Sequence, residues 1–163
     1  MAFTKDVRCA GACGAYQDAG KTGYAVGDAL AASPANTADV LKSTDGGETW
    51  AATSTDPFAG AEDISSVTLF YMGRDTLRVL VARGTTDAGA PAEVAYSDNG
   101  GTTWTLANVG STNAQYATKG GALFALDQYN IWFASTGGYL YKSEDGGVSW
   151  TAKQTGVLTT GNY

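Results

Sequence analysis

The chain has 163 residues and a net charge of −6; 44% of its residues are hydrophobic and only 16% are charged. This composition argues against a disordered chain and suits one domain with a buried core. The negative charge argues against nucleic-acid backbones and anionic membrane surfaces as partners, and the absence of histidine removes the commonest general base and metal ligand.

The apolar pattern predicts an all-β chain, because no segment of about ten residues shows a helical period. The candidate strands form three sets of four, in which short apolar segments alternate with Gly-rich turns. These sets are expected at 7–12, 22–28, 39–42 and 49–53, then at 67–72, 77–83, 93–96 and 103–107, and finally at 122–127, 130–135, 139–142 and 149–153.

Three octets share the pattern S-x-[DN]-x-G-x-[ST]-W: box 1 at 43–50, box 2 at 97–104 and box 3 at 143–150. A chance match is on the order of one in a million per window at average residue usage, so the chain contains an internal repeat. We assign a structural role to the shared positions: Ser43, Asp45, Gly47, Thr49, Trp50, Ser97, Asn99, Gly101, Thr103, Trp104, Ser143, Asp145, Gly147, Ser149 and Trp150.

Each box has the chemistry of a tight hairpin. Its two adjacent glycines can adopt a positive φ, and its Asp or Asn can accept hydrogen bonds from nearby backbone N–H groups. Asn99 in box 2 keeps the acceptor without the charge, which favours a hydrogen-bonding role over an electrostatic one. The tryptophan is expected to start the return strand and to anchor the hairpin on a core.

The boxes resemble the Asp-boxes, or BNR repeats, of β-propeller proteins. That family includes sialidases and other glycosidases, sortilin-type receptors, photosystem II assembly-factor-like propellers, and phage or bacterial surface proteins. The segments 22–28 and 121–150 look like blades of the assembly-factor-like group. The resemblance implies four-stranded antiparallel blades in which each box joins the third and fourth strands and holds the fold, outside any active site.

Three blades are expected, at about 1–56, 57–110 and 111–156, with a connector at 157–163. Propellers usually close with about four to eight blades, so three blades make a partial ring. Three explanations stay open. The ring is completed by a longer parent chain, or by oligomerisation, for example in a dimer of six blades, or the blades pack against other subunits in a large assembly.

The sequence assigns no catalytic, cofactor-binding or metal-binding residue. Most acids lie in turns, and the arginines Arg8, Arg74, Arg78 and Arg83 do not suit a sialidase-like arginine triad, because Arg78 and Arg83 are expected on opposite faces of one strand. Cys9 and Cys13 have no histidine partner, and two free thiols are favoured over a disulfide.

The expected function is a non-catalytic structural or recognition module, best placed in a virion or another extracellular assembly. Its partners would be protein subunits, either copies of itself or neighbours in the assembly, with glycan as a second candidate ligand for aromatic residues such as Trp132. No nucleic acid, membrane insertion or cofactor is expected. The alternatives are a sialidase-like glycoside hydrolase with its catalytic residues in other blades, and an intracellular assembly factor. The chain as given shows no signal peptide, so the cytoplasm is the second choice of location.

Overall fold

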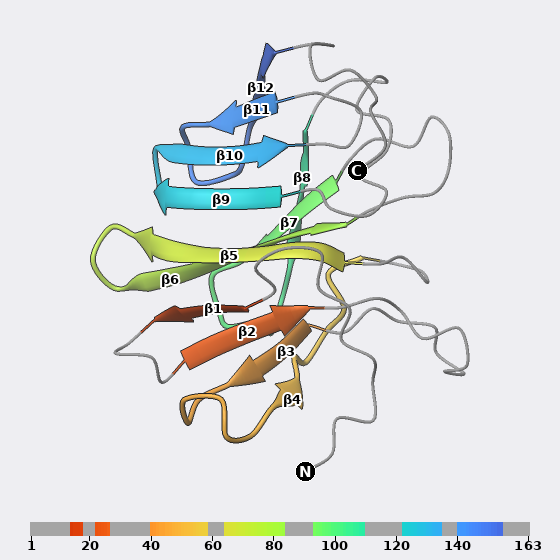
Figure 1. Ribbon diagram of the computed structural model, residues 1–163, viewed down its shortest axis with the longest axis vertical. Coiled ribbons are helices and arrows are strands. Elements are labelled where there is room, and N and C mark those ends of the chain that lie inside the picture. The colour runs from red at the N-terminus through yellow and green to blue at the C-terminus, as the bar shows by residue number, and fades with distance from the viewer. Residues whose placement is uncertain are drawn as a thin grey trace.

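A computed structural model of the chain describes residues 14–17, 22–26, 40–58, 64–83, 93–109, 122–134 and 140–154. These residues form three four-stranded antiparallel sheets, which confirms the all-β prediction (Figure 1). Among them, no helix is long and apolar enough to cross a membrane.

In each sheet, consecutive strands are neighbours, so that every sheet is a simple meander. Sheet 1 contains β1 (Gly14–Gln17), β2 (Thr22–Val26), β3 (Val40–Ser43) and β4 (Ala51–Ala52). Sheet 2 contains β5 (Ile64–Met72), β6 (Thr76–Arg83), β7 (Glu93–Ser97) and β8 (Thr105–Asn108). Sheet 3 contains β9 (Ala122–Asp127), β10 (Asn130–Ala134), β11 (Leu140–Ser143) and β12 (Thr151–Gln154).

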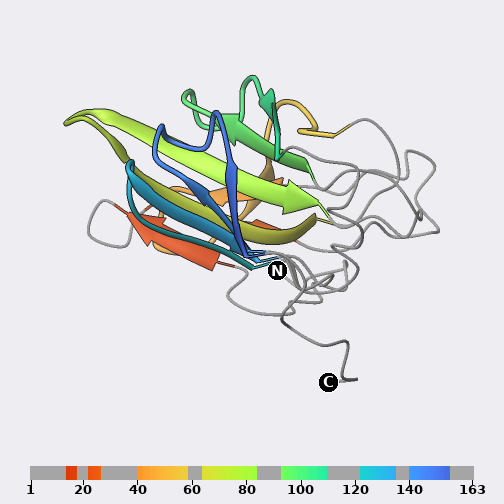
Figure 2. The same ribbon diagram turned by 90° about the horizontal axis from the view of Figure 1, so that it is seen from above.

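The sheets are stacked through their first strands. Strand β5 contacts β1 and β2 on one side and β9 on the other, so sheet 2 lies between sheets 1 and 3 (Figure 1). The view along the stack shows β6, β7 and β8 fanning outward from β5 (Figure 2). This arrangement is that of three consecutive propeller blades, with the first strand of each blade innermost.

Sheet 2 is buried on both faces, as the middle blade must be. Because alternate residues of a strand point to opposite faces, Val79 and Val81 of β6 pack in the cluster shared with sheet 1. Leu80 and Ala82 pack in the cluster shared with sheet 3. All four of these side chains are fully buried, so β6 is the centre of the described core.

Within the described residues, the first strand of sheet 1 is β1, which lies beyond the segment that the sequence pattern predicted. The strand that pairs with β2 is Gly14–Gln17, whereas the expected strand at 7–12 lies outside the described residues. The equivalent hairpins in sheets 2 and 3 have only short turns, at 73–75 and 128–129. β1 is separated from β2 by residues 18–21, a connection of similar length, whereas a strand ending at residue 12 would be separated from β2 by residues 13–21.

The box tryptophans are less buried than predicted. Trp50, Trp104 and Trp150 are all half-buried, and the return strand starts one residue after each of them. Trp104 and Trp150 still pack against the two core clusters, and Trp150 meets the ring of Phe133 edge-on at 6.3 Å. Trp104 and Trp150 therefore cover the edge of the core, where the chain leaves the turn.

Candidate functional site

The serine at the start of each box organises its turn. In box 1, the buried Ser43 hydroxyl donates to Asp45 Oδ1 at 2.8 Å and accepts from the Gly47 N–H at 2.9 Å. Ser97 and Ser143 make the same pair of contacts in boxes 2 and 3. Both glycines of each box have a positive φ, between 71° and 93°, as the turn chemistry predicts. The three boxes are thus three copies of one hydrogen-bonded turn.

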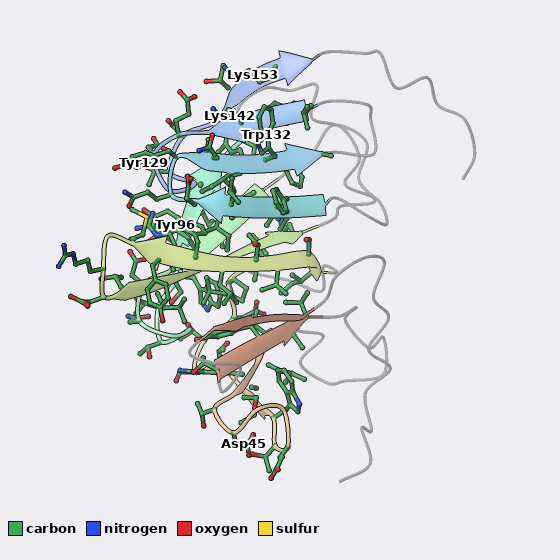
Figure 3. All side chains as sticks on the ribbon, turned by 60° about the vertical axis from the view of Figure 1, so that its left-hand side comes forward. Asp45, Tyr96, Tyr129, Trp132, Lys142 and Lys153 are labelled. Atoms are coloured by element: carbon green, nitrogen blue, oxygen red, sulfur yellow. The ribbon has the colours of Figure 1, made fainter. Side chains whose placement is uncertain are left out.

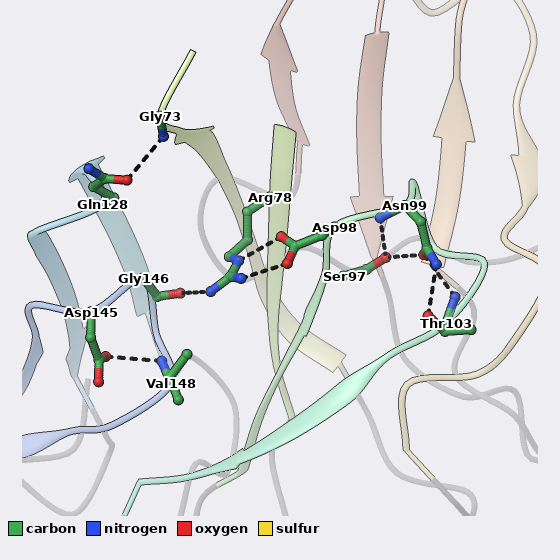
Figure 4. Close-up of polar contacts among 10 residues, drawn as sticks. All are labelled: Gly73, Arg78, Ser97, Asp98, Asn99, Thr103, Gln128, Asp145, Gly146 and Val148. Atoms are coloured by element: carbon green, nitrogen blue, oxygen red, sulfur yellow. Dashed lines mark hydrogen bonds and ion pairs between the residues drawn. The ribbon is translucent and has the colours of Figure 1, made fainter. Parts of the chain in front are cut away.

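Box 2 shows that this turn does not require a charge. Asn99 Oδ1 accepts from the Thr103 N–H at 2.9 Å, as Asp45 Oδ1 accepts from the Thr49 N–H at 3.0 Å. The hydroxyl contact is reversed. The Asn99 amide donates to Thr103 Oγ1 (Figure 4), whereas Thr49 Oγ1 donates to Asp45 Oδ2. The hydrogen bonds from Thr49 and Ser43 lower the pKa of Asp45 to about 2.

The turn of each later box docks on the sheet before it. The second glycine of box 2 lies against Thr53, and a Cβ added to Gly147 of box 3 would stand 2.5 Å from Leu80 Cδ2. Thr55 completes the first of these contacts, because its hydroxyl donates to the Thr102 carbonyl at 3.1 Å and its own carbonyl accepts from Trp104 Nε1 at 3.1 Å. The boxes therefore connect neighbouring blades as well as closing their own hairpins.

Arg78 joins sheets 2 and 3. Its guanidinium binds both carboxylate oxygens of Asp98, at 2.7 and 2.6 Å, and Nη1 donates to the Gly146 carbonyl of box 3 at 3.0 Å (Figure 4). The same group lies over the Tyr96 ring, 4.2 Å from its centre. The Gly73 N–H adds a second link, to Gln128 Oε1 at 3.1 Å. Sequence reasoning missed this clamp, because it joins residues far apart in the chain.

The outer face of sheet 3 is uncovered and apolar. Phe124, Trp132 and Lys142 are direct neighbours across β9, β10 and β11, so their side chains share one face. Phe124 is 60% exposed, and Leu126, two residues further along β9, is 71% exposed. Lys142 Nζ lies 5.6 Å from the centre of the Trp132 ring. We call these four residues the open face of sheet 3; Figure 3 labels Trp132 and Lys142.

The sequence pointed to Trp132 but not to its neighbours. The strand Asn130–Ala134 is apolar on both faces, as predicted, and its buried face carries Ile131 and Phe133. Other aromatic residues divide between core and surface: Tyr24 and Tyr141 are buried, whereas Tyr129 is 60% exposed. Leu123 and Phe124 are equally apolar in the sequence, and only the packing of sheet 3 on sheet 2 shows which of them is covered.

The comparisons with known proteins agree with this geometry. The family model for the BNR/Asp-box repeat matches residues 41–52 and 95–106, which contain the whole of boxes 1 and 2. The chain carries Asp-box repeats. Box 3, with the same hydrogen bonds, is a third copy by its geometry. Among curated proteins, no sequence matches this chain.

Three solved structures of propeller proteins are similar in fold to this Asp-box chain but share little of its sequence. YCF48 bound to a D1 peptide has a TM-score of 0.56 and 18% sequence identity, and the match covers 85% of this chain. YCF48 from Cyanidioschyzon merolae has a TM-score of 0.53 and 20% sequence identity, and the match covers 87% of this chain. An ancestral GH74 enzyme has a TM-score of 0.57 and 21% sequence identity, and the match covers 84% of this chain. The Asp-box chain spans only 38%, 37% and 17% of those three chains, respectively.

Several described acids of the Asp-box chain form ion pairs. Asp98 binds Arg78, Glu93 binds Arg83 at 2.8 Å, and Glu144 binds Lys142 at 2.6 Å. In the part of the chain that the structure describes, no three acidic, Cys or His side chains come together as a metal site. Cys9 and Cys13 lie outside the described residues.

The described arginines do not converge on a common point. Arg78 faces sheet 3, whereas Arg83 lies over the ring of Phe58, 5.4 Å from its centre, in the cluster shared with sheet 1. The two side chains therefore lie on opposite faces of β6, which confirms the prediction from their spacing. Arg74 is exposed in the β5–β6 hairpin, and Arg8 lies outside the described residues.

Proposed function

We propose that this Asp-box chain is a non-catalytic recognition module that contacts other proteins through the open face of sheet 3. The observation that carries this proposal is the exposure of Phe124 and Leu126, at 60% and 71%, beside the half-buried Trp132. Soluble proteins seldom leave neighbouring apolar side chains uncovered on one face unless that face binds something.

The chemistry of the face favours a protein partner. Aromatic and aliphatic side chains with a polar rim are typical of the centre of protein interfaces, and here Lys142 and Lys153 lie beside the apolar residues (Figure 3). The neighbouring YCF48 structure holds a D1 peptide, and we extend the general property, binding of a protein segment, to this chain as part of the proposal.

We place the module in a virion-type or other extracellular assembly, with the cytoplasm as the alternative location. The composition supports an assembly component, because 44% of the residues are hydrophobic and only 16% are charged. In such an assembly the stacked blades would supply a rigid support, and the open face would supply the contact.

A photo-crosslinking experiment in the source cells tests the proposed contact. A benzophenone amino acid at position 124 is expected to form an adduct with one protein, identified by mass spectrometry. The same amino acid at Tyr71, which is 40% exposed on sheet 2, serves as the control and is expected to form none. No adduct at position 124, or equal adducts at both positions, would overturn the proposal.

A second measurement addresses the alternative of an enzyme. The purified chain is expected to leave a panel of aryl glycosides unchanged. Turnover that disappears when one or two acids are replaced would show a glycosidase instead. Glycan binding at the open face without any protein adduct would likewise overturn the proposal that the partner is a protein.

A further inference from the structure

The open face of sheet 3 repeats a docking arrangement that the chain already uses. In all three sheets the box serine pairs with a residue of the second strand: Ser43 with Gly23, Ser97 with Val79, and Ser143 with Ile131. The next residue of that strand pairs in turn with the residue before the serine. This cross-strand pair, which we call the docking pair, is Tyr24–Lys42 in sheet 1, Leu80–Tyr96 in sheet 2 and Trp132–Lys142 in sheet 3.

The docking pairs of sheets 1 and 2 are each covered by the glycine turn of the next box. A Cβ on Gly100 of box 2 would stand 2.7 Å from Lys42 Nζ and 3.4 Å from the Tyr24 hydroxyl. In box 3 it is the second glycine, Gly147, that meets Leu80 of sheet 2, while the first, Gly146, lies against Met72 and Arg78. Only a turn without side chains can approach so closely, so the two adjacent glycines are the feature that fits a docking pair.

The docking pair of sheet 3 has the same construction as that of sheet 1. Lys42 Nζ lies 5.8 Å from the centre of the Tyr24 ring, and Lys142 Nζ lies 5.6 Å from that of Trp132. Tyr24 is 1% exposed beneath box 2, whereas the Trp132 pair is flanked by the exposed Phe124 and Leu126. Within the described residues, no glycine turn lies on the sheet 3 pair.

Box 1 is the corresponding turn without a docking pair. Gly46 is exposed and Gly47 half-buried, whereas Gly146 and Gly147 of box 3 are both buried. The φ angles of Gly46 and Gly47, 78° and 93°, match those of the docked turns. Asp45 of box 1 and the labelled residues of sheet 3 lie at opposite ends of the stack (Figure 3). One end of the stack therefore carries an unused turn, and the other an uncovered docking pair.

The charges of the two ends are complementary. Thr53, which meets the second glycine of box 2, follows Ala52 in sheet 1. Lys153 follows Ala152, the equivalent of Ala52, in sheet 3, where a shift of register between Leu140 and Tyr141 inserts it before Gln154. A box 1 turn docked on sheet 3 would bring Glu48, the residue after Gly47, next to Lys153. Both of these side chains are exposed in the single chain. In the internal contact, both corresponding residues, Thr102 and Thr53, are uncharged.

We propose that the open face of sheet 3 binds the box 1 turn of a second copy of this chain. Two copies, each offering one turn and one docking pair, would close a ring of six blades, within the usual range of about four to eight. This inference rests on the proposed function, since it names the protein that the open face contacts. Three copies would give nine blades, which is outside that range.

A charge exchange tests the contact in the full 163-residue chain. Light scattering after gel filtration is expected to give twice the chain mass of 16.7 kDa. Glu48→Lys and Lys153→Glu should each weaken the dimer about tenfold, and the double variant should regain most of the loss. Asp75→Lys and Arg74→Glu, which make the same charge changes in the exposed β5–β6 hairpin, are the matched controls and should have no effect.

The outcomes separate this inference from the proposed function. A monomer, an open-ended filament, or a dimer unaffected by either charge variant would overturn the second copy as the partner. An adduct at position 124 with a different protein would then leave the proposed function standing. Circular dichroism of each variant checks whether unfolding causes a changed mass. The variants are expected to stay folded, because all four substituted residues are exposed.

Discussion

At the residue scale, the boxes show how a short polar sequence fixes a turn without using charge as such. The serine hydroxyl is buried at the centre of the turn, and the Asp or Asn oxygen accepts backbone N–H groups at 2.9 to 3.0 Å in all three boxes. Burial acts to raise the pKa of Asp145, but the hydrogen bonds from Ser149 outweigh it, and the net shift is downward. Hydrogen bonding therefore dominates the chemistry of these acids.

Acid should destabilise the chain through Asp45. Its pKa lies at about 2 in the folded chain, below its ordinary value of 3.8, so its contribution to stability is full above about pH 4 and is lost as the pH falls through 2. Asp45→Asn keeps the acceptor, as Asn99 does, and should make the unfolding free energy less dependent on pH in this range. Urea titrations at pH 5 and pH 2.5 measure the unfolding free energies of the parent chain and the variant. Asn99→Asp is the reciprocal control and should increase the pH dependence.

Two glycines with positive φ allow the stability cost of backbone strain to be measured apart from the cost of overpacking. Gly73 has a φ of 68° and no atom within 4 Å of an added Cβ, whereas a Cβ at Gly147, with a φ of 89°, meets Leu80. Gly73→Ala should cost about 1–2 kcal/mol, from the left-handed backbone alone. Gly147→Ala should cost about 1–3 kcal/mol more, because it overpacks the contact between sheets 2 and 3. Equal losses in chemical denaturation would show that box 3 does not dock tightly.

At the element scale, Arg78 is the main polar link between two blades. Its side chain is 9% exposed, and it binds Asp98 of its own sheet and the Gly146 carbonyl of the next. A buried charge with three well-placed acceptors fixes the approach of the two sheets, whereas apolar packing alone would tolerate sliding.

Replacing Arg78 should therefore weaken the stack. Arg78→Met should lower the unfolding free energy by about 2–3 kcal/mol, less than for a fully buried pair because Asp98 is partly exposed and stays hydrated. Glu144→Gln removes the exposed ion pair with Lys142 and, as the control, should cost less than about 1 kcal/mol. If both substitutions cost the same in urea denaturation, Arg78 is not a clamp.

At the scale of the whole molecule, most of the fold was predictable and most of the contacts between sheets were not. The strands on either side of each box followed from alternation and turn chemistry, because both are local properties of the sequence. The Arg78 clamp depends on residues 78, 98 and 146 meeting in space, which no local pattern encodes. The open face was hidden for a related reason: β9 is apolar on both sides, and burial depends on which side the neighbouring blade covers.

The uncovered ends of the stack, the box 1 turn and the open face of sheet 3, lead to a final prediction about stability. If copies of the chain close into a ring, the apparent Tm should rise with protein concentration, because association stabilises only the folded chain. Phe124→Ser combined with Leu126→Ser should abolish that dependence and leave the Tm at low concentration almost unchanged, since both side chains are exposed in the single chain. Leu106→Ser, at a side chain that is 57% exposed on sheet 2, is the control and should preserve the dependence. A Tm independent of concentration in the parent chain would mean that each end of the stack stays uncovered or binds a different protein.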